Sequence, residues 1–153
     1  MKQIAVPVEI AHTASEDPAV ISLCSEQAAT LKARYPDDAE APMPVDSDVT
    51  FLLARIEGIA AGCACLQPLT PEIAEARRVF VTPDQRGQGV SRLLLIALED
   101  LAASRGHLVL RLETGDLQPE AIGLYQAAGF RRVPRYAPYL DSPRSICFEK
   151  DLG

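Results

Sequence analysis

The chain has 153 residues, and 48% of them are apolar, which is enough for one domain with a single hydrophobic core. The formal net charge of −6 disfavours a nucleic-acid-binding protein, because such proteins usually present a basic face. The amino-terminal segment becomes charged too early for a signal peptide, and no apolar run has the length of a membrane span. We therefore expect one domain over residues 1–153 that is cytoplasmic and has neither nucleic acid nor membrane as a partner.

The first half of the chain is predicted to contain one helix between short strands. Asp17 before Pro18 is a typical helix start, since aspartate caps the first turn and proline suits the first helical position. Glu57 and Gly58 separate two β-rich runs, which predicts a hairpin. In chain order, the predicted elements are a strand at 3–9, a helix from 18 to about 35, a proline-rich loop at 36–48, and strands at 49–55 and 59–66.

The second half alternates between strands and helices. Gly106 follows an apolar helical stripe and predicts the end of a helix. The predicted elements are a strand at 74–81, a helix at 91–105, a strand at 108–113, a helix at 119–128 and a closing strand at 145–150. This order predicts an α/β (α+β) fold with a mixed, mostly antiparallel central sheet of about six to seven strands and helices on both faces.

Residues 131–144 combine arginines with prolines and are predicted to form a shaped loop before the last strand. The arginines are either ordinary surface charge or a site for a substrate carboxylate. The four cysteines, Cys24, Cys63, Cys65 and Cys147, lack the paired spacing of a metal site, so we expect reduced structural thiols and no metal. Cys63 and Cys65 are two residues apart, and a strand would place both on one face.

A glycine-bearing loop begins at Arg86 and leads directly into the predicted helix at 91–105. Gly87 and Gly89 can adopt backbone angles that are closed to other residues, so consecutive N–H groups can turn toward one ligand. The helix that follows presents its own unpaired N–H groups at the same place, which favours phosphate. The spacing matches neither a P-loop nor the dinucleotide fingerprint.

A second motif lies at residues 121–130, with the pattern Ala-Ile-x-Leu-Tyr-x-x-x-Gly-Phe. Together with residues 81–89, Val-x-Pro-x-x-Arg-Gly-x-Gly, it resembles the two acyl-CoA-binding motifs of the GNAT N-acetyltransferases. The resemblance covers residues 50–151 at motif level. It implies the GNAT fold, in which the strands at 74–81 and 108–113 splay apart and a pantetheine arm lies in the gap like another strand.

The implied cofactor is acetyl-CoA. Two positions depart from the family pattern, because Ser91 replaces a glycine or alanine and Gln118 replaces an asparagine. Arg86 and Arg92 have the alternative of being solvated charges at a helix start. The cofactor-binding residues that the resemblance implies are Phe80, Val81, Arg86, Gly87, Gln88, Gly89, Val90, Ser91, Arg92 and Gln118.

Acetyl transfer needs a group that protonates the departing thiolate and one that receives the proton of the amine. Tyr125 stands where the family places its general acid, and its alternative role is that of a core aromatic. Glu75 matches the position of a catalytic glutamate in several members, although an ion pair with Arg77 is the alternative. Glu113, at the end of the other splayed strand, is the second candidate base, and a water chain is the third.

Regular alternation along residues 74–81 would place Glu75, Arg77, Val79 and Val81 on one face.

We expect an acetyl-CoA-dependent N-acetyltransferase that acts on a primary amine, in a small molecule, by direct attack in a ternary complex. A net negative charge suits such a cationic acceptor. The alternatives are a protein or peptide N-acetyltransferase and a non-catalytic acyl-CoA sensor. Homodimerisation, which the fold often shows, is left open, and the apolar final strand would serve it.

Overall fold

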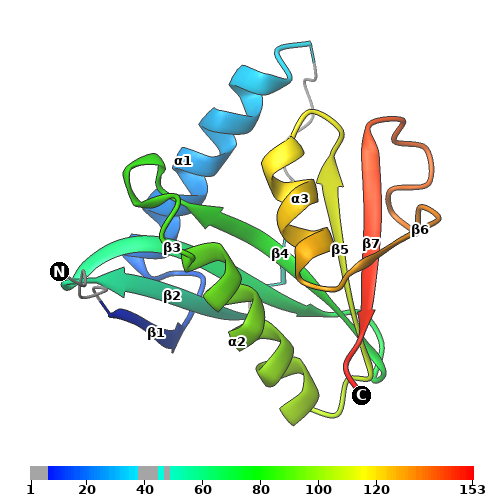
Figure 1. Cartoon of the computed structure of the whole chain (residues 1–153), viewed down its shortest axis with the longest axis horizontal. Coiled ribbons are helices and arrows are strands. Elements are labelled where there is room, and N and C mark those ends of the chain that lie inside the picture. The colour runs from blue at the N-terminus through cyan, green and yellow to red at the C-terminus, as the bar shows by residue number, and fades with distance from the viewer. Residues whose placement is uncertain (1–6, 38–44, 47–48) are drawn as a thin grey trace, which may run out of the picture.

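The computed structural model describes residues 7–37, 45–46 and 49–153. Within these residues, seven strands form one sheet and three α-helices pack on it (Figure 1). In chain order the elements are β1 (Val8–Thr13), α1 (Pro18–Arg34), β2 (Thr50–Ile56), β3 (Ile59–Pro68), β4 (Ile73–Val81), the 3₁₀ turn η1 (Pro83–Gln85), α2 (Val90–Ser104), β5 (Val109–Gly115), α3 (Pro119–Ala127), β6 (Arg131–Val133) and β7 (Ser145–Asp151).

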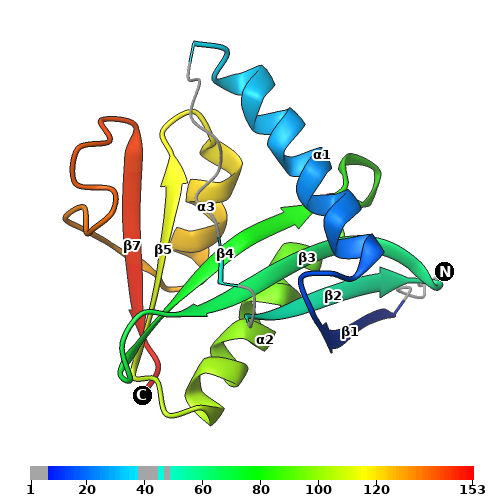
Figure 2. The same cartoon turned by 180° about the vertical axis from the view of Figure 1, so that it is seen from behind.

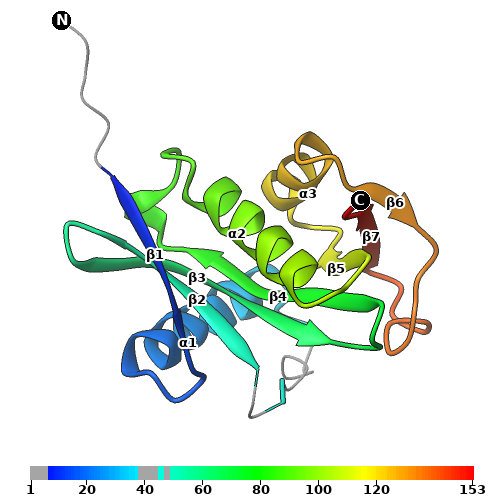
Figure 3. The same ribbon diagram turned by 90° about the horizontal axis from the view of Figure 1, so that it is seen from below.

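The strand order is β1-β2-β3-β4-β5-β7-β6. Every neighbouring pair is antiparallel except β4 and β5, which run parallel. Helix α1 covers one face of the sheet, and α2 and α3 cover the other (Figure 3). The mixed, mostly antiparallel sheet with helices on both faces is therefore confirmed.

Each face of the sheet has its own apolar core. On the α2 and α3 face, Leu94 and Leu98 of α2 and Tyr125 of α3 pack with strand residues such as Leu112. On the α1 face, Val20 and Leu23 pack against a smaller cluster. Cys63 and Cys65 both lie in that smaller cluster, which confirms that they share a face. The caps follow the sequence, because the Asp17 carboxylate accepts from Ala19 N–H at 2.9 Å and Gly106 has φ of 87°.

Strands β4 and β5 separate partway along their length. Residues 73–76 pair with residues 109–112, and beyond Ala76 the pairing ends. Figure 2 shows the two strands diverging toward their carboxyl ends, with β7 continuing beside β5. The expected splay is therefore confirmed, and it leaves the last part of β4 without a partner strand on that side.

A β-bulge changes which residues of β4 share a face. The register between β3 and β4 shifts between Cys63 and Cys65, and Arg78 has a positive φ of 56°. Val79 and Val81 pack with the core under α2 and α3, whereas Cys65, the partner of Arg77, lies on the α1 face. The prediction that Glu75, Arg77, Val79 and Val81 lie on one face is wrong, because the extra residue at the bulge reverses the alternation.

Three boundaries differ from the prediction or fall outside the description. The strand expected at 3–9 begins only at Val8 and continues to Thr13, and residues 1–6 lie outside the described residues. Most of the loop expected at 36–48 also lies outside them. The short strand β6 occupies the start of a segment predicted to be a loop. None of the described helices is both long and apolar enough to cross a membrane.

Candidate active site

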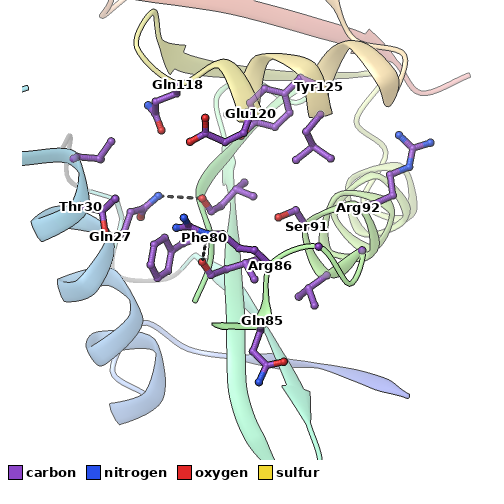
Figure 4. A pocket seen from close by; sticks show the side chains of 18 of the residues that line it. Gln27, Thr30, Phe80, Gln85, Arg86, Ser91, Arg92, Gln118, Glu120 and Tyr125 are labelled. Atoms are coloured by element: carbon purple, nitrogen blue, oxygen red, sulfur yellow. Dashed lines mark hydrogen bonds between the residues drawn. The ribbon is translucent and has the colours of Figure 1, made fainter. Parts of the chain in front are cut away.

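A groove of about 330 Å³ is lined by α1, by the end of β4, by α3 and by the start of α2 (Figure 4). It brings together nine of the ten predicted cofactor-binding residues. These are Phe80, Val81, Arg86, Gly87, Gly89, Val90, Ser91, Arg92 and Gln118. Gln88 does not line this groove, and its side-chain amide donates to Gln85 at 2.9 Å.

The glycine loop forms one end of the groove. Gly87 and Gly89 have φ values of 82° and 80°, where a side chain would strain the backbone. Gly89 is the N-cap of α2 and offers no side chain to cap it, so the N–H groups of the first helical turn, including that of Ser91, are available to a ligand. This end of the groove has the donor arrangement of a phosphate site.

Arg86 lines the groove beside the end of β4. Its Nε donates to the Val81 carbonyl at 3.1 Å, and its guanidinium lies 5.8 Å from the centroid of the Phe80 ring. Figure 4 shows both side chains at the middle of the groove, between α1 and α2. A positive charge therefore lies beside the glycine loop and is held by the end of the strand.

Helix α1 forms the opposite wall, which was not predicted. Gln27 Nε2 donates to the Val79 carbonyl at 3.1 Å, just where β4 has left β5. Arg34 forms an ion pair with Glu120 of α3, so α1 and α3 are bridged across the groove. Because Gln27, Thr30 and Arg34 recur at intervals of three or four, they share one helix face. In the sequence this polar face is indistinguishable from a solvated one.

A second, smaller pocket of about 190 Å³ continues from the groove into the splay between β4 and β5. The two cavities share Gln27, Leu31, Val79, Gln118, Ala121 and Tyr125. The remaining lining residues of the second pocket are Ala76, Arg77, Arg78, Glu113, Thr114 and Tyr139. The two cavities are therefore adjacent, and Tyr125 is one of the residues that line both.

Tyr125, which lines both cavities, is buried among aromatic rings. Its ring packs against Phe130 and Phe148, with centroids 6.1 Å and 6.0 Å away, and the side chain is 6% exposed. Burial raises the pKa of the Tyr125 hydroxyl above its ordinary value, and the negative charge of Glu113 raises it further. The hydroxyl therefore keeps its proton at neutral pH and can donate a hydrogen bond.

Glu75 is buried on the α1 face of β4, with 3% of its surface exposed. Its carboxylate accepts a hydrogen bond of 2.6 Å from the Tyr136 hydroxyl and lies 3.4 Å from Nε of Arg77. Burial raises the pKa of Glu75 above its ordinary value, against the opposing effects of Tyr136 and Arg77. The ion pair considered from the sequence is therefore present, and Glu75 does not line either pocket.

Glu113 lines the second pocket. The Ser145 hydroxyl donates to its carboxylate at 2.5 Å and in turn lies 2.8 Å from the Ser142 hydroxyl. Burial raises the pKa of Glu113, Ser145 lowers it, and the charge of Glu75 raises it. The two candidate bases are therefore close enough to influence each other, and Glu113 is the one that faces the space beside Tyr125.

The arginines of residues 131–144 serve other contacts. Arg131 pairs with Glu149 and Asp151, and Arg135 donates to the carbonyls of Pro143 and Ser145. Neither pocket described above includes an arginine of this segment. Arg77 and Arg78 do line the second pocket. From the sequence, Arg77 was considered only as an ion-pair partner of Glu75 and Arg78 only as a strand residue. The bulge at Arg78 leaves no clear mark in the sequence.

Comparison with known proteins gives a consistent result. The sequence profile described as the acetyltransferase (GNAT) family matches residues 19–130. An IAA acetyltransferase of Azospirillum brasilense is 34% identical over 150 residues, which cover 95% of this chain and 98% of that protein. A crystal structure from Klebsiella pneumoniae, described as an acyl-CoA N-acyltransferase, is 34% identical with a TM-score of 0.80, covering 95% of this chain and 98% of that one. A GNAT acetyltransferase of Elizabethkingia anophelis with acetyl-CoA bound has the same fold, with 19% identity, a TM-score of 0.71, and coverage of 94% and 97% of the two chains.

Proposed function

The chain belongs to the GNAT family of acetyltransferases, which take the acetyl group from acetyl-CoA, and we propose that its acceptor is the primary amine of a small molecule. The observation that carries this proposal is the small second pocket, which shares Tyr125 and five other lining residues with the larger groove. Its volume of about 190 Å³ suits a compact acceptor. The Azospirillum relative is named an IAA acetyltransferase, and that name also supports a small acceptor.

The larger groove suits the cofactor. Acetyl-CoA supplies a thioester carbonyl that an amine can attack. We assign its pyrophosphate to the N–H groups around Gly87, Gly89 and Ser91, with Arg86 and Arg92 as charge partners. The backbone of β4 beyond Ala76 has no partner strand toward β5, so Phe80 and Val81 can hydrogen-bond an extended arm.

Glu113 is proposed to receive the proton of the acceptor amine. An amine attacks only after it has lost a proton, and Glu113 is the carboxylate that faces the second pocket. Its raised pKa makes it a stronger base than an ordinary glutamate. Glu75 is proposed to assist from behind, because its charge raises the pKa of Glu113 while Arg77 and Tyr136 hold it in place.

Tyr125 is proposed to donate its hydroxyl proton to the departing thiolate. It lines both cavities, which supports a role between the cofactor and the acceptor. Burial raises the pKa of the hydroxyl, so it is still protonated when the thiolate departs. No cysteine of the described chain lines either pocket, which supports direct attack by the amine rather than transfer through an enzyme thioester.

Acetyl-CoA turnover, followed by release of the CoA thiol, tests this proposal against small amines and short peptides. We expect turnover with small amines, and a loss of about 100-fold in kcat for Tyr125→Phe. Calorimetric titration should show that this variant still binds acetyl-CoA. Comparable kcat/KM on peptide amino termini would favour a peptide acetyltransferase. Near-normal turnover in Tyr125→Phe would show that Tyr125 is not the general acid.

The two carboxylates can be separated by their pH–rate profiles. We expect Glu113→Gln to lower kcat/KM by about 100-fold and to abolish the fall in rate on the acid side. Glu75→Gln should keep that fall, displaced to lower pH, because the negative charge that raises the pKa of Glu113 has been removed. If instead Glu75→Gln abolishes the acid limb, Glu75 is the base.

A further inference from the structure

Two consecutive arginines of β4 line the second pocket. In a regular strand Arg77 and Arg78 would point to opposite faces of the sheet. Here both line the pocket along the unpaired edge of β4, between Ala76 and Val79, and Arg78 occupies the bulge with φ of 56°. A positive φ is unfavourable for arginine, and unfavourable backbone conformations of this kind cluster at binding sites.

This pocket has charges of both signs. Arg77, Arg78 and Glu113 line it, and Glu75, which does not line it, forms an ion pair with Arg77 at 3.4 Å. Tyr139 adds a hydroxyl at the same pocket. A purely cationic acceptor would bind near Glu113 and place no negative group near Arg78. An acceptor with both an amine and a carboxylate would complement Glu113 and Arg78 together.

We propose that the acceptor bears a carboxylate close to its amine, as an amino acid does, and that Arg78 binds this carboxylate while Glu113 faces the amine. This inference rests on the proposed function and names its substrate class. The small pocket requires the two charged groups to be a few bonds apart, because Arg78 and Glu113 line the same space of about 190 Å³. Guanidinium presents several N–H donors in one plane, so Arg78 can keep its protein contacts and still bind a carboxylate.

The geometry assigns this role to Arg78 rather than to Arg77. Arg77 already forms an ion pair with Glu75, which is itself held by Tyr136. Arg78 is half-buried and lines the same pocket at the bulge. The arginines of residues 131–144 line other surfaces or bind backbone carbonyls.

Matched acceptor pairs test the inference: L-leucine with isopentylamine, L-methionine with 3-(methylthio)propylamine, and L-phenylalanine with phenethylamine. Each pair differs only in the carboxylate. We expect the wild-type enzyme to prefer the amino acid of at least one pair by about 100-fold in kcat/KM. Arg78→Asn, which tolerates a positive φ, should lower kcat/KM for that amino acid by about 100-fold and leave the simple amine within about threefold.

Two further variants sharpen the test. Arg78→Lys keeps the charge without the planar donors, so it should recover part of the preference. Arg132→Asn, on β6, is the matched control and should leave the preference unchanged, because Arg132 lines neither of the two pockets. Retained acetyl-CoA affinity and an unchanged melting temperature show that Arg78→Asn is folded.

The outcomes separate the inference from the proposed function. If the simple amines are acetylated as well as the amino acids, or if Arg78→Asn slows both members of a pair equally, the inference is wrong and the small-amine function stands. If peptides are acetylated and neither series of small amines is, the proposed function fails and the inference fails with it.

Discussion

The hydroxyl of Tyr136 donates a hydrogen bond of 2.6 Å to Oε2 of Glu75, although 61 residues separate them in the chain. Arg111 lies against the same ring, with its guanidinium 5.0 Å from the ring centroid, and Tyr139 packs edge-on at 5.5 Å. These contacts attach the segment between β6 and β7 to the middle of β4. They also fix the position of Glu75 beside Arg77. The negative charge of Glu75 in turn raises the pKa of Glu113.

Loss of the Tyr136 hydroxyl should destabilise the protein in a pH-dependent way. The hydroxyl stabilises the charged form of Glu75 and so lowers its pKa, against the raising effect of burial. In Tyr136→Phe the buried carboxylate loses this donor, and we expect a loss of about 1–3 kcal/mol in the free energy of unfolding at neutral pH. In acid, where the carboxyl is protonated in both proteins, the loss should shrink. Urea denaturation at the two pH values measures this, and equal losses at both would contradict the account.

Glu113 should lower stability at neutral pH. Burial raises its pKa in the folded protein, so above its ordinary pKa the folded state holds more protons than the unfolded one. The contribution of this group to stability therefore falls as pH rises toward the raised pKa. Glutamine cannot ionise and still accepts from Ser145, so Glu113→Gln should be more stable than wild type near neutral pH. The difference should vanish in acid, and thermal melts across pH would show it. A variant less stable than wild type at neutral pH would refute this.

The motifs at the groove could be predicted from the sequence because they depend on local backbone conformation. Gly87 and Gly89 need positive φ, and only glycine adopts it without strain, so their positions identify the loop directly. The splay between β4 and β5 came from the family resemblance. It describes the structure correctly, because the pairing of the two strands ends at Ala76.

The features that escaped prediction depend on tertiary contacts. Nothing local identifies Arg78 as a bulge residue, because arginine has no preference for positive φ. Strand β1 is the edge strand beside β2, and none of its residues is fully buried, so its sequence shows only a weak apolar alternation. The roles of Gln27 and Arg34 follow from the packing of α1 against the groove, which a helical periodicity does not specify.

Gly62 should not tolerate alanine, whereas Gly123 should. A Cβ at Gly62 would lie 2.6 Å from the backbone carbonyl of Phe80, so β3 and β4 would have to move apart beside the groove. We expect Gly62→Ala to cost about 1–3 kcal/mol in the free energy of unfolding and to weaken acetyl-CoA binding. Gly123 lies on the exposed side of α3 with no atom within 4 Å of a Cβ, so Gly123→Ala should gain about 0.4–1 kcal/mol. Urea denaturation of both variants makes the comparison, and a neutral Gly62→Ala would show that the strands can separate at little cost.

Gly89 and Gly106 provide a matched pair for the phosphate loop. They have φ values of 80° and 87°, and a Cβ at either would meet no atom within 4 Å. Backbone strain should therefore make alanine at either position lower the free energy of unfolding by about 1–2 kcal/mol. The two positions differ in function, because Gly89 caps the start of α2 at the groove and Gly106 follows the other end of the same helix.

Only Gly89→Ala should weaken the binding of acetyl-CoA, by about tenfold, since the N–H groups that face the phosphates would shift with the strained loop. Gly106→Ala should bind acetyl-CoA as wild type does despite its lower stability. Calorimetric titration with acetyl-CoA, together with thermal melts of both variants, separates the two effects. Equal affinity losses would mean that a general loosening of α2, rather than the conformation of the loop, governs cofactor binding.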